Sequence, residues 1–160
     1  MTMTMMKRFK CAAKNKALAK ARFQMPKRQP LGMVSVGGKV YKVGTSKAEK
    51  DWLDKFGITQ RQKVFYGFHG KIFVVDGVDE RRRIVYEYLG EQAHGSHKTY
   101  KTNRDVKTWL GKTPNQMYYE TVERFNYLND LGYQVFFVWY LDNKKGYLGR
   151  FYRGRGDNLY

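Results

Sequence analysis

The chain has 160 residues, of which 42% are hydrophobic and 16% aromatic, and its formal net charge is +17. This length suffices for one domain with a substantial core, and the apolar content excludes a disordered chain. No apolar run approaches the roughly 18 residues of a membrane-spanning helix. Cys11 is the only cysteine, which excludes intrachain disulfides and cysteine-rich zinc sites and suits a reducing cytoplasm. The excess of positive charge predicts a polyanionic partner, nucleic acid first and an anionic membrane surface second.

Residues 1–31 are predicted to form a basic N-terminal helix or arm followed by a linker. Residues 1–48 carry 12 Lys and Arg and no acid, so most of the net charge lies here. The stretch 7–24 is rich in alanine and lysine and ends before Pro26, a pattern typical of a basic helix ordered on DNA and equally of a solvated tail. The cations expected to contact DNA phosphates in this segment are Lys7, Arg8, Lys10, Lys14, Lys16, Lys20 and Arg22.

Residues 32–44 are predicted to form a β-hairpin extension. Apolar and polar residues alternate on both sides of Gly37-Gly38, which is the signal of a two-residue hairpin turn. Lys39 and Lys42 on the second strand are expected to follow the DNA backbone.

Residues 45–142 are predicted to form an α/β core, a mixed sheet flanked by helices. Ser46 is the expected N-cap of the first helix, where Glu49 completes a capping box, and Gly57 ends this helix. A helical pattern over 116–131 precedes the nearly all-apolar stretch 134–140, which predicts a strand buried on both faces. Further strands are expected at 63–68, 71–76 and 84–89. Residues 143–160 are interpreted as a basic, aromatic C-terminal tail whose DNA-binding cations are Arg150, Arg153 and Arg155.

Two carboxylates and a histidine gather in the stretch 74–95. If the charged turn between its two strands centres near residues 81–82, Asp76 lies opposite Glu87 or Tyr88, with Cβ atoms roughly 5 Å apart. That spacing lets two oxygens share a Mg²⁺ ion with ligand distances of about 2.1 Å. A shift of one residue would move Glu87 to the other face, and a backbone carbonyl near Tyr88 would then supply the second ligand. His94 follows the strand and is placed to exchange a proton with the attacking water or the leaving oxygen. Glu49 is expected to support the site from the first helix.

Each of these residues also has a structural explanation. Carboxylates at hairpin ends are usually solvated or paired with Lys and Arg, and Glu49 is fully accounted for as a capping residue. These carboxylates and the histidine occur together in a chain with a formal net charge of +17, and this combination favours a functional interpretation. A metal and a base cleave a phosphodiester, and the cationic surface attracts the polyanion.

The order and spacing of several short motifs resemble a known group of nucleases. The motifs are Val75-Asp76-Gly77, residues 85–91, His94-Gly95 and residues 121–124 and 131–139, with residues 46–49 and 56–58 upstream. Over about residues 45–140 they are similar to the very short patch repair-like branch of the PD-(D/E)XK nuclease superfamily. Within it, the most similar type is the phage homing endonucleases described by an EDxHD motif.

The resemblance implies a restriction-endonuclease-like fold with a Mg²⁺ site, in which Mn²⁺ can substitute, and no zinc. Asp76 would be the metal-binding aspartate, Glu87 the acidic residue of the next strand and Tyr88 the donor of a backbone carbonyl ligand. His94 would act as acid and base, and Glu49 would be the helix glutamate of the motif.

The chain also departs from the pattern. Leu89 stands where most of the superfamily has the lysine of its Glu-x-Lys motif, so a histidine must replace that lysine. Ala93 stands where relatives often carry tryptophan, which puts a stacking role at this position in doubt.

The sequence therefore predicts an endodeoxyribonuclease that nicks or cuts double-stranded DNA, of phage homing type and acting in the host cytoplasm. A homodimer on DNA is one arrangement that would cut both strands, and no membrane partner is expected. Two alternatives stay open. One is a non-catalytic nucleic-acid-binding protein on the same fold, and the other is a structure- or mismatch-specific repair nuclease.

Overall fold

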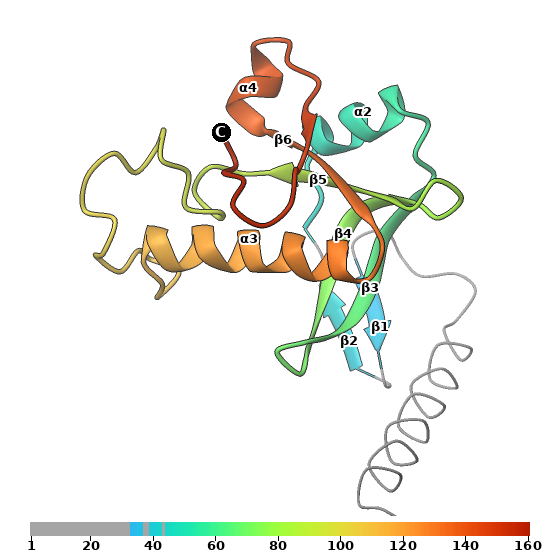
Figure 1. The fold of residues 1–160 in the computed structure, drawn as a ribbon, viewed down its shortest axis with the longest axis horizontal. Helices are drawn as coiled ribbons and strands as arrows, with labels where there is room; N and C mark the ends of the chain where they lie inside the picture. Colours follow the sequence, from blue (N-terminus) through green and yellow to red (C-terminus); the bar gives the residue numbers. More distant parts are fainter. Residues whose placement is uncertain (1–32, 37–38, 43) are drawn as a thin grey trace, which may run out of the picture. The chain divides into compact units, whose positions relative to one another are not determined.

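Residues 45–160 form a five-stranded mixed sheet with helices on both faces (Figure 1). The strands are β3 (Gln60–Phe68), β4 (Lys71–Asp79), β5 (Ile84–Leu89), β6 (Gln134–Trp139) and β7 (Arg150–Phe151), and they lie side by side in that order. Only β5 and β6 run parallel, and the other neighbours are antiparallel. The α/β class and the mixed sheet predicted from the sequence are therefore confirmed.

The computed structural model describes residues 33–36, 39–42 and 44–160, with side chains from residue 44 onward. It divides into two compact units, Met1–Gly44 and Thr45–Tyr160. In the first unit, β1 (Met33–Val36) and β2 (Lys39–Lys42) pair antiparallel, and the partners Val36 and Lys39 leave two residues for the turn, as predicted. The basic segment 7–24 and the linker lie outside the described residues, as do the side chains of Lys39 and Lys42.

Helix α3 (Pro114–Asp130) covers one face of the sheet. Its buried Phe125 and Leu128 pack in one cluster with side chains of β5 and β6, among them Val85, Val135 and Phe137. The helix begins two residues before the predicted start because Thr113 is its N-cap. The Thr113 hydroxyl accepts a hydrogen bond from the Gln116 amide at 3.1 Å.

Helix α2 (Lys47–Lys55) covers the opposite face. Trp52 and Leu53, both fully buried, pack there against Tyr86 and Tyr88 of β5 and Val138 of β6. Side chains of β6 thus enter both clusters, which confirms that this strand is buried on its two faces. Among the described residues, no helix has the length and apolar character needed to cross a bilayer.

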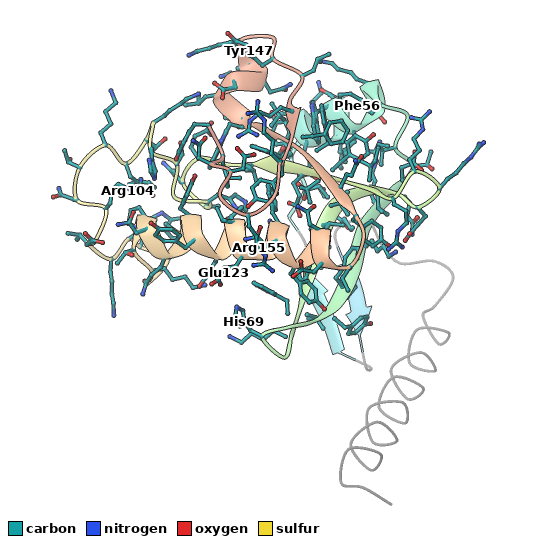
Figure 2. All side chains as sticks on the ribbon, viewed as in Figure 1. Phe56, His69, Arg104, Glu123, Tyr147 and Arg155 are labelled. Atoms are coloured by element: carbon teal, nitrogen blue, oxygen red, sulfur yellow. The ribbon has the colours of Figure 1, made fainter. Side chains whose placement is uncertain are left out.

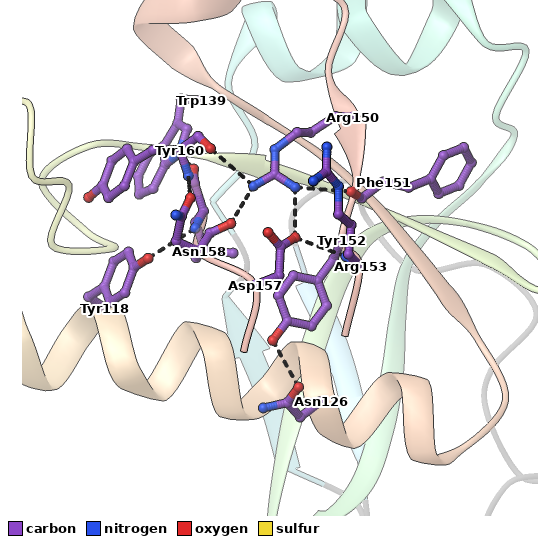
Figure 3. A network of polar contacts seen from close by, with 11 residues as sticks. Tyr118, Asn126, Trp139, Arg150, Phe151, Tyr152, Arg153, Asp157, Asn158 and Tyr160 are labelled. Atoms are coloured by element: carbon purple, nitrogen blue, oxygen red, sulfur yellow. Dashed lines mark hydrogen bonds and ion pairs between the residues drawn. The ribbon is translucent and has the colours of Figure 1, made fainter. Parts of the chain in front are cut away.

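Residues 143–160 belong to the core and not to a separate tail, which corrects the predicted organisation. The short helix α4 (Tyr140–Lys144) follows β6, and β7 then pairs with β6. Figure 3 shows the contacts that fasten the last residues. The Trp139 indole N–H donates to the Leu159 carbonyl, and the Leu159 amide donates to the Tyr118 hydroxyl at 2.9 Å. Because Leu159 is fully buried, the end of the chain is part of the folded domain.

Candidate active site at the open end of a hairpin

Strands β4 and β5 separate at the point where the candidate residues stand. Their last paired residues are Gly77 and Tyr86, in a register centred on residues 81–82 as predicted. Beyond that pair β4 continues beside β3, whereas β5 continues beside β6 as far as the partners Leu89 and Trp139. The first residues past the separation are Asp76 and Glu87, which the register sets opposite each other. The predicted opposition of these two carboxylates therefore agrees with the strand register.

Asp76 bridges the gap between the two strands. Its Oδ2 accepts a hydrogen bond of 2.6 Å from the Tyr88 backbone N–H. Because N–H and C=O of one strand residue face the same neighbouring strand, the Tyr88 carbonyl also lies on the β4 side of β5. Burial raises the pKa of Asp76 to about 6, although the Tyr88 N–H and the charge of Arg124 act in the opposite direction. The Tyr88 carbonyl therefore faces the strand that carries Asp76.

Glu87 is almost fully buried and is held by an arginine of α3. Its side chain is 3% exposed, and Oε2 accepts a hydrogen bond of 3.1 Å from Arg124 Nη2. The other carboxylate oxygen, Oε1, is buried without a hydrogen-bond partner. Burial raises the pKa of Glu87 to about 8, against the lowering effect of Arg124 and together with repulsion from Asp76 and Glu49. A buried oxygen that lacks a donor marks a position where a cation or water would be stabilised.

Glu49 reaches the same region from α2. It completes the predicted capping box, since its amide donates to the Ser46 hydroxyl at 3.0 Å and its carboxylate accepts from the Ser46 amide at 3.4 Å. Burial, followed by the negative charge of Asp76, raises the pKa of Glu49 to about 7. Glu49 therefore lies near enough to Asp76 for the two carboxylates to interact.

The close approach of α2 to β4 depends on Gly77, the residue after Asp76. A Cβ atom at this position would lie 2.8 Å from methyl groups of Leu53 and Ile58. A side chain would therefore push α2 away from the strand, and Glu49 with it. The three acids Glu49, Asp76 and Glu87, which we call the carboxylate cluster, owe their proximity partly to this glycine.

His94 is held in one tautomer by a threonine of α3. Its Nδ1 lies 2.9 Å from the Thr121 hydroxyl oxygen, and that hydroxyl donates to the Met117 carbonyl at 2.9 Å. Because the hydroxyl has a single proton and gives it to Met117, it accepts from His94, so Nδ1 carries the imidazole hydrogen. Burial and the positive charge of Arg124 lower the pKa of His94 to about 3. His94 is therefore neutral, with the lone pair of Nε2 available to accept a proton.

Thr121 and Arg124 bring His94 and Glu87 together. They are three residues apart on α3 and so share one face of the helix. One of them contacts His94 and the other Glu87. His94 and Glu87 are thus connected through neighbouring positions of α3, while Glu49, Asp76 and Glu87 lie near enough for their charges to interact.

The loop that carries His94 is fastened to the start of α3. Gly95 has φ +63°, and a Cβ atom there would lie 2.0 Å from the Pro114 carbonyl oxygen. Arg104, labelled in Figure 2, donates to the Gly95 and Tyr100 carbonyls at 3.1 and 3.0 Å and to the Asn115 side chain at 2.8 Å. His94 therefore stands on a loop with a defined conformation.

The residues present fit a hard divalent cation that keeps much of its water. Among residues 44–160, no three His, Cys, Asp or Glu side chains meet in a metal-ligating group. Two opposed carboxylates and one carbonyl would leave the other positions of an octahedral Mg²⁺ ion to water, as this ion prefers. The unpartnered Glu87 Oε1 favours added positive charge, as do the raised pKa values of Glu49 and Glu87, which result first from burial and then from neighbouring negative charge.

The C-terminal cations expected to bind DNA lie in different surroundings. Arg150 is held by the Asp157 carboxylate at 2.7 Å and by carbonyls near the chain end, so it supports the fold (Figure 3). Arg155 forms an exposed ion pair with Asp130 at 2.7 Å, and Arg153 is exposed. The other predicted DNA-binding residues, seven in segment 7–24 and two in β2, lie outside the described side chains.

Sequence reasoning gave no role to Thr121, Arg124 or Arg104. The helical pattern of 116–131 was available, and it placed Thr121 and Arg124 on one helix face. Nothing local indicated that this face would meet Glu87 and His94. Arg104 looked like one cation among many in a polar loop.

Comparisons with protein-family models, with curated proteins and with solved structures find no match to this chain. The nuclease resemblance therefore rests on the sequence motifs and stays a prediction.

Proposed function

We propose that the protein is a metal-dependent endodeoxyribonuclease that hydrolyses phosphodiester bonds of double-stranded DNA. The observation that carries the proposal is the opposition of Asp76 and Glu87 where β4 and β5 separate, with α3 holding Glu87 through Arg124 and His94 through Thr121. Mg²⁺ or Mn²⁺ at these carboxylates would neutralise phosphate charge and lower the pKa of water. The formal charge of +17 supports a polyanionic substrate.

In this mechanism each residue has a defined task. Asp76 and Glu87 would hold the cation, with the Tyr88 carbonyl as a further ligand, and Glu49 would add negative charge and orient water. His94 accepts the proton of the attacking water at Nε2, while the Thr121 hydroxyl keeps Nδ1 protonated. Burial is the larger cause of the low pKa of His94 and the charge of Arg124 the second, so a phosphodiester that offsets Arg124 would shift this pKa upward.

A phage homing endonuclease is the particular type that the motifs favour. A repair nuclease for mismatched or branched DNA would use the same site. Cleavage rates on plain, mismatched and branched duplexes distinguish these two.

The test is cleavage of supercoiled plasmid by the full chain with Mg²⁺ or Mn²⁺, against EDTA. We expect metal-dependent nicked or linear product from the native chain and none from Asp76→Asn or His94→Ala. Asp51→Asn, an exposed aspartate of α2, is the control for the loss of one carboxylate. All variants should still bind duplex DNA.

Two results would contradict the proposal. Product that persists in EDTA, or in the Asp76→Asn preparation, would show that another activity cleaves the plasmid. Salt-sensitive DNA binding without cleavage by the native chain would favour the non-catalytic DNA-binding protein.

A further inference from the structure

The one arginine of α3, Arg124, is central to the electrostatics of the site. Its charge lowers the pKa values of Asp76, Glu87 and His94 together, so it acts on both carboxylates and on the base. Its side chain is only 19% exposed and lies over the Phe73 ring, with its guanidinium carbon 5.8 Å from the ring centre. No other cation in residues 44–160 affects all three groups.

The ion pair between Arg124 and Glu87 is incomplete on both sides. Nη2 donates to Glu87 Oε2 at 3.1 Å, but the Arg124 Nε and the Glu87 Oε1 are both buried without a hydrogen-bond partner. A guanidinium can pair with a carboxylate through two parallel bonds, and this pair uses one. Each buried polar group without a partner destabilises the folded state, so the arrangement is not one that stability alone would favour.

The charges of the site indicate that a divalent cation and a phosphodiester would satisfy the groups that lack partners. The carboxylate cluster carries −3 when ionised, and Arg124 supplies +1, which leaves −2 for a divalent cation to balance. A cation bound to Glu87 would repel the guanidinium at 3.1 Å from the same carboxylate. A phosphodiester entering the site offers oxygen acceptors with the geometry that an arginine fork matches.

We propose that Arg124 binds the phosphate that is cleaved, and that its contact with Glu87 is the resting position it occupies in the metal-free protein. With Glu87 engaged by a cation, the Arg124 guanidinium would move to a non-bridging oxygen of the phosphodiester, where charge develops as water attacks phosphorus. No covalent bond to Arg124 forms or breaks. This inference rests on the proposed nuclease function. It makes Arg124 a source of positive charge in a site where Leu89 stands in place of the lysine of the Glu-x-Lys motif.

If Arg124 moves from Glu87 to the phosphate, its replacement should have opposite effects on Mn²⁺ affinity and on the cleavage rate. Arg124→Met removes the competitor of the cation and also the phosphate ligand. We expect it to bind Mn²⁺ about tenfold more tightly, because a repelling charge is gone. We expect its single-turnover plasmid cleavage with Mg²⁺ to be about 10²–10³-fold slower, the usual effect of losing one donor to a developing oxyanion. Mn²⁺ binding to the full chain without DNA is measured by the electron paramagnetic resonance signal of the free ion.

Two further variants keep the test decisive. Arg124→Lys retains the charge but loses the planar fork, so it should bind Mn²⁺ about as the native chain does and cleave about tenfold more slowly. It also serves if Arg124→Met does not fold. Arg82→Gln removes one positive charge from the turn at the closed end of the same hairpin, where the side chain is 72% exposed. It should change neither measurement.

The possible results separate the two proposals. If Arg124→Met and Arg124→Lys cleave at the native rate, or bind Mn²⁺ more weakly, Arg124 is a structural residue and this inference is wrong while the nuclease function stands. If the native chain neither binds Mn²⁺ nor cleaves, the nuclease function itself is wrong.

Discussion

At the scale of the residue, the tautomer of His94, the proposed proton acceptor, depends on one hydroxyl. Thr121 accepts from His94 only because its own proton goes to the Met117 carbonyl. Thr121→Val has the same shape but no acceptor, so His94 should lose its fixed tautomer. We expect cleavage to slow by about tenfold or more, the range seen when a group that orients a functional histidine is removed, with DNA affinity unchanged.

Thr121→Ser keeps the hydroxyl and is the matched control, since it should retain most of the native rate. The ¹⁵N chemical shifts of the histidine ring report the tautomer directly and do not depend on activity. Native ring shifts in Thr121→Val together with a native rate would contradict the role given to Thr121.

The ionisation of the carboxylate cluster should make the metal-free protein less stable as pH rises. The pKa values of Glu49 and Glu87 are raised from 4.5 to about 7 and about 8, so the folded state binds more protons than the unfolded state up to those values. The pKa of His94 is lowered from 6.5 to about 3, which has the opposite effect but only below pH 6.5. Between pH 6.5 and 8.5 the carboxylates therefore dominate.

In EDTA, we expect Tm to fall across this window. The free energy of unfolding should decrease by on the order of 1 kcal/mol per pH unit for each extra proton that the folded state binds. Glu87→Gln should flatten the decline because glutamine does not titrate, and Mg²⁺ should raise Tm more at pH 8.5 than at pH 6.5. Differential scanning calorimetry of both proteins checks this. A Tm that rises with pH in EDTA would contradict the raised pKa values.

At the scale of the element, the structure follows the sequence where the signals are local. The capping box of Ser46 and Glu49 and the stop at Gly57 predicted α2 nearly to the residue. The symmetrical turn at residues 81–82 fixed the register of β4 and β5, and with it the opposition of Asp76 and Glu87. Local chemistry decides such features, so one chain is enough to recognise them.

Elements that depend on distant partners were not predictable in this way. Strand β7 has two residues and exists because it pairs with β6, and Arg150 is neutralised by Asp157 and the chain end. The cationic residues 143–160 therefore looked like a tail. In the same way, Arg124 could be assigned to a helix face, but its partner Glu87 is 37 positions earlier in the chain.

At the scale of the whole molecule, the proposed function would divide DNA binding and cleavage between two parts of an unevenly charged chain. Residues 1–48 supply +12 of the formal +17, whereas the carboxylate cluster lies on a part of the chain with 14 acids. A dense cationic segment binds any duplex through its phosphates and releases counterions as it does so. The site residues would then determine whether the bound DNA is cut.

This division can be tested by salt dependence. Replacing Lys7, Arg8, Lys10, Lys14, Lys16, Lys20 and Arg22 with glutamine lowers the formal charge from +17 to +10. If all seven contact phosphates, the slope of log K against log salt concentration should become shallower by about 6. Arg153→Gln with Arg155→Gln, the comparison variant, should change the slope by about 2 at most.

Fluorescence anisotropy of a labelled duplex between low and moderate salt measures both slopes, and cleavage at saturating DNA measures the chemistry. We expect the variant with seven substitutions to cleave at the native rate once DNA is bound, because none of these substitutions lies in the carboxylate cluster. An unchanged slope would mean that residues 7–22 do not contact DNA and that the cations of residues 45–160 provide the binding. A slope that falls together with the saturated rate would mean that the basic segment also positions the DNA at the site.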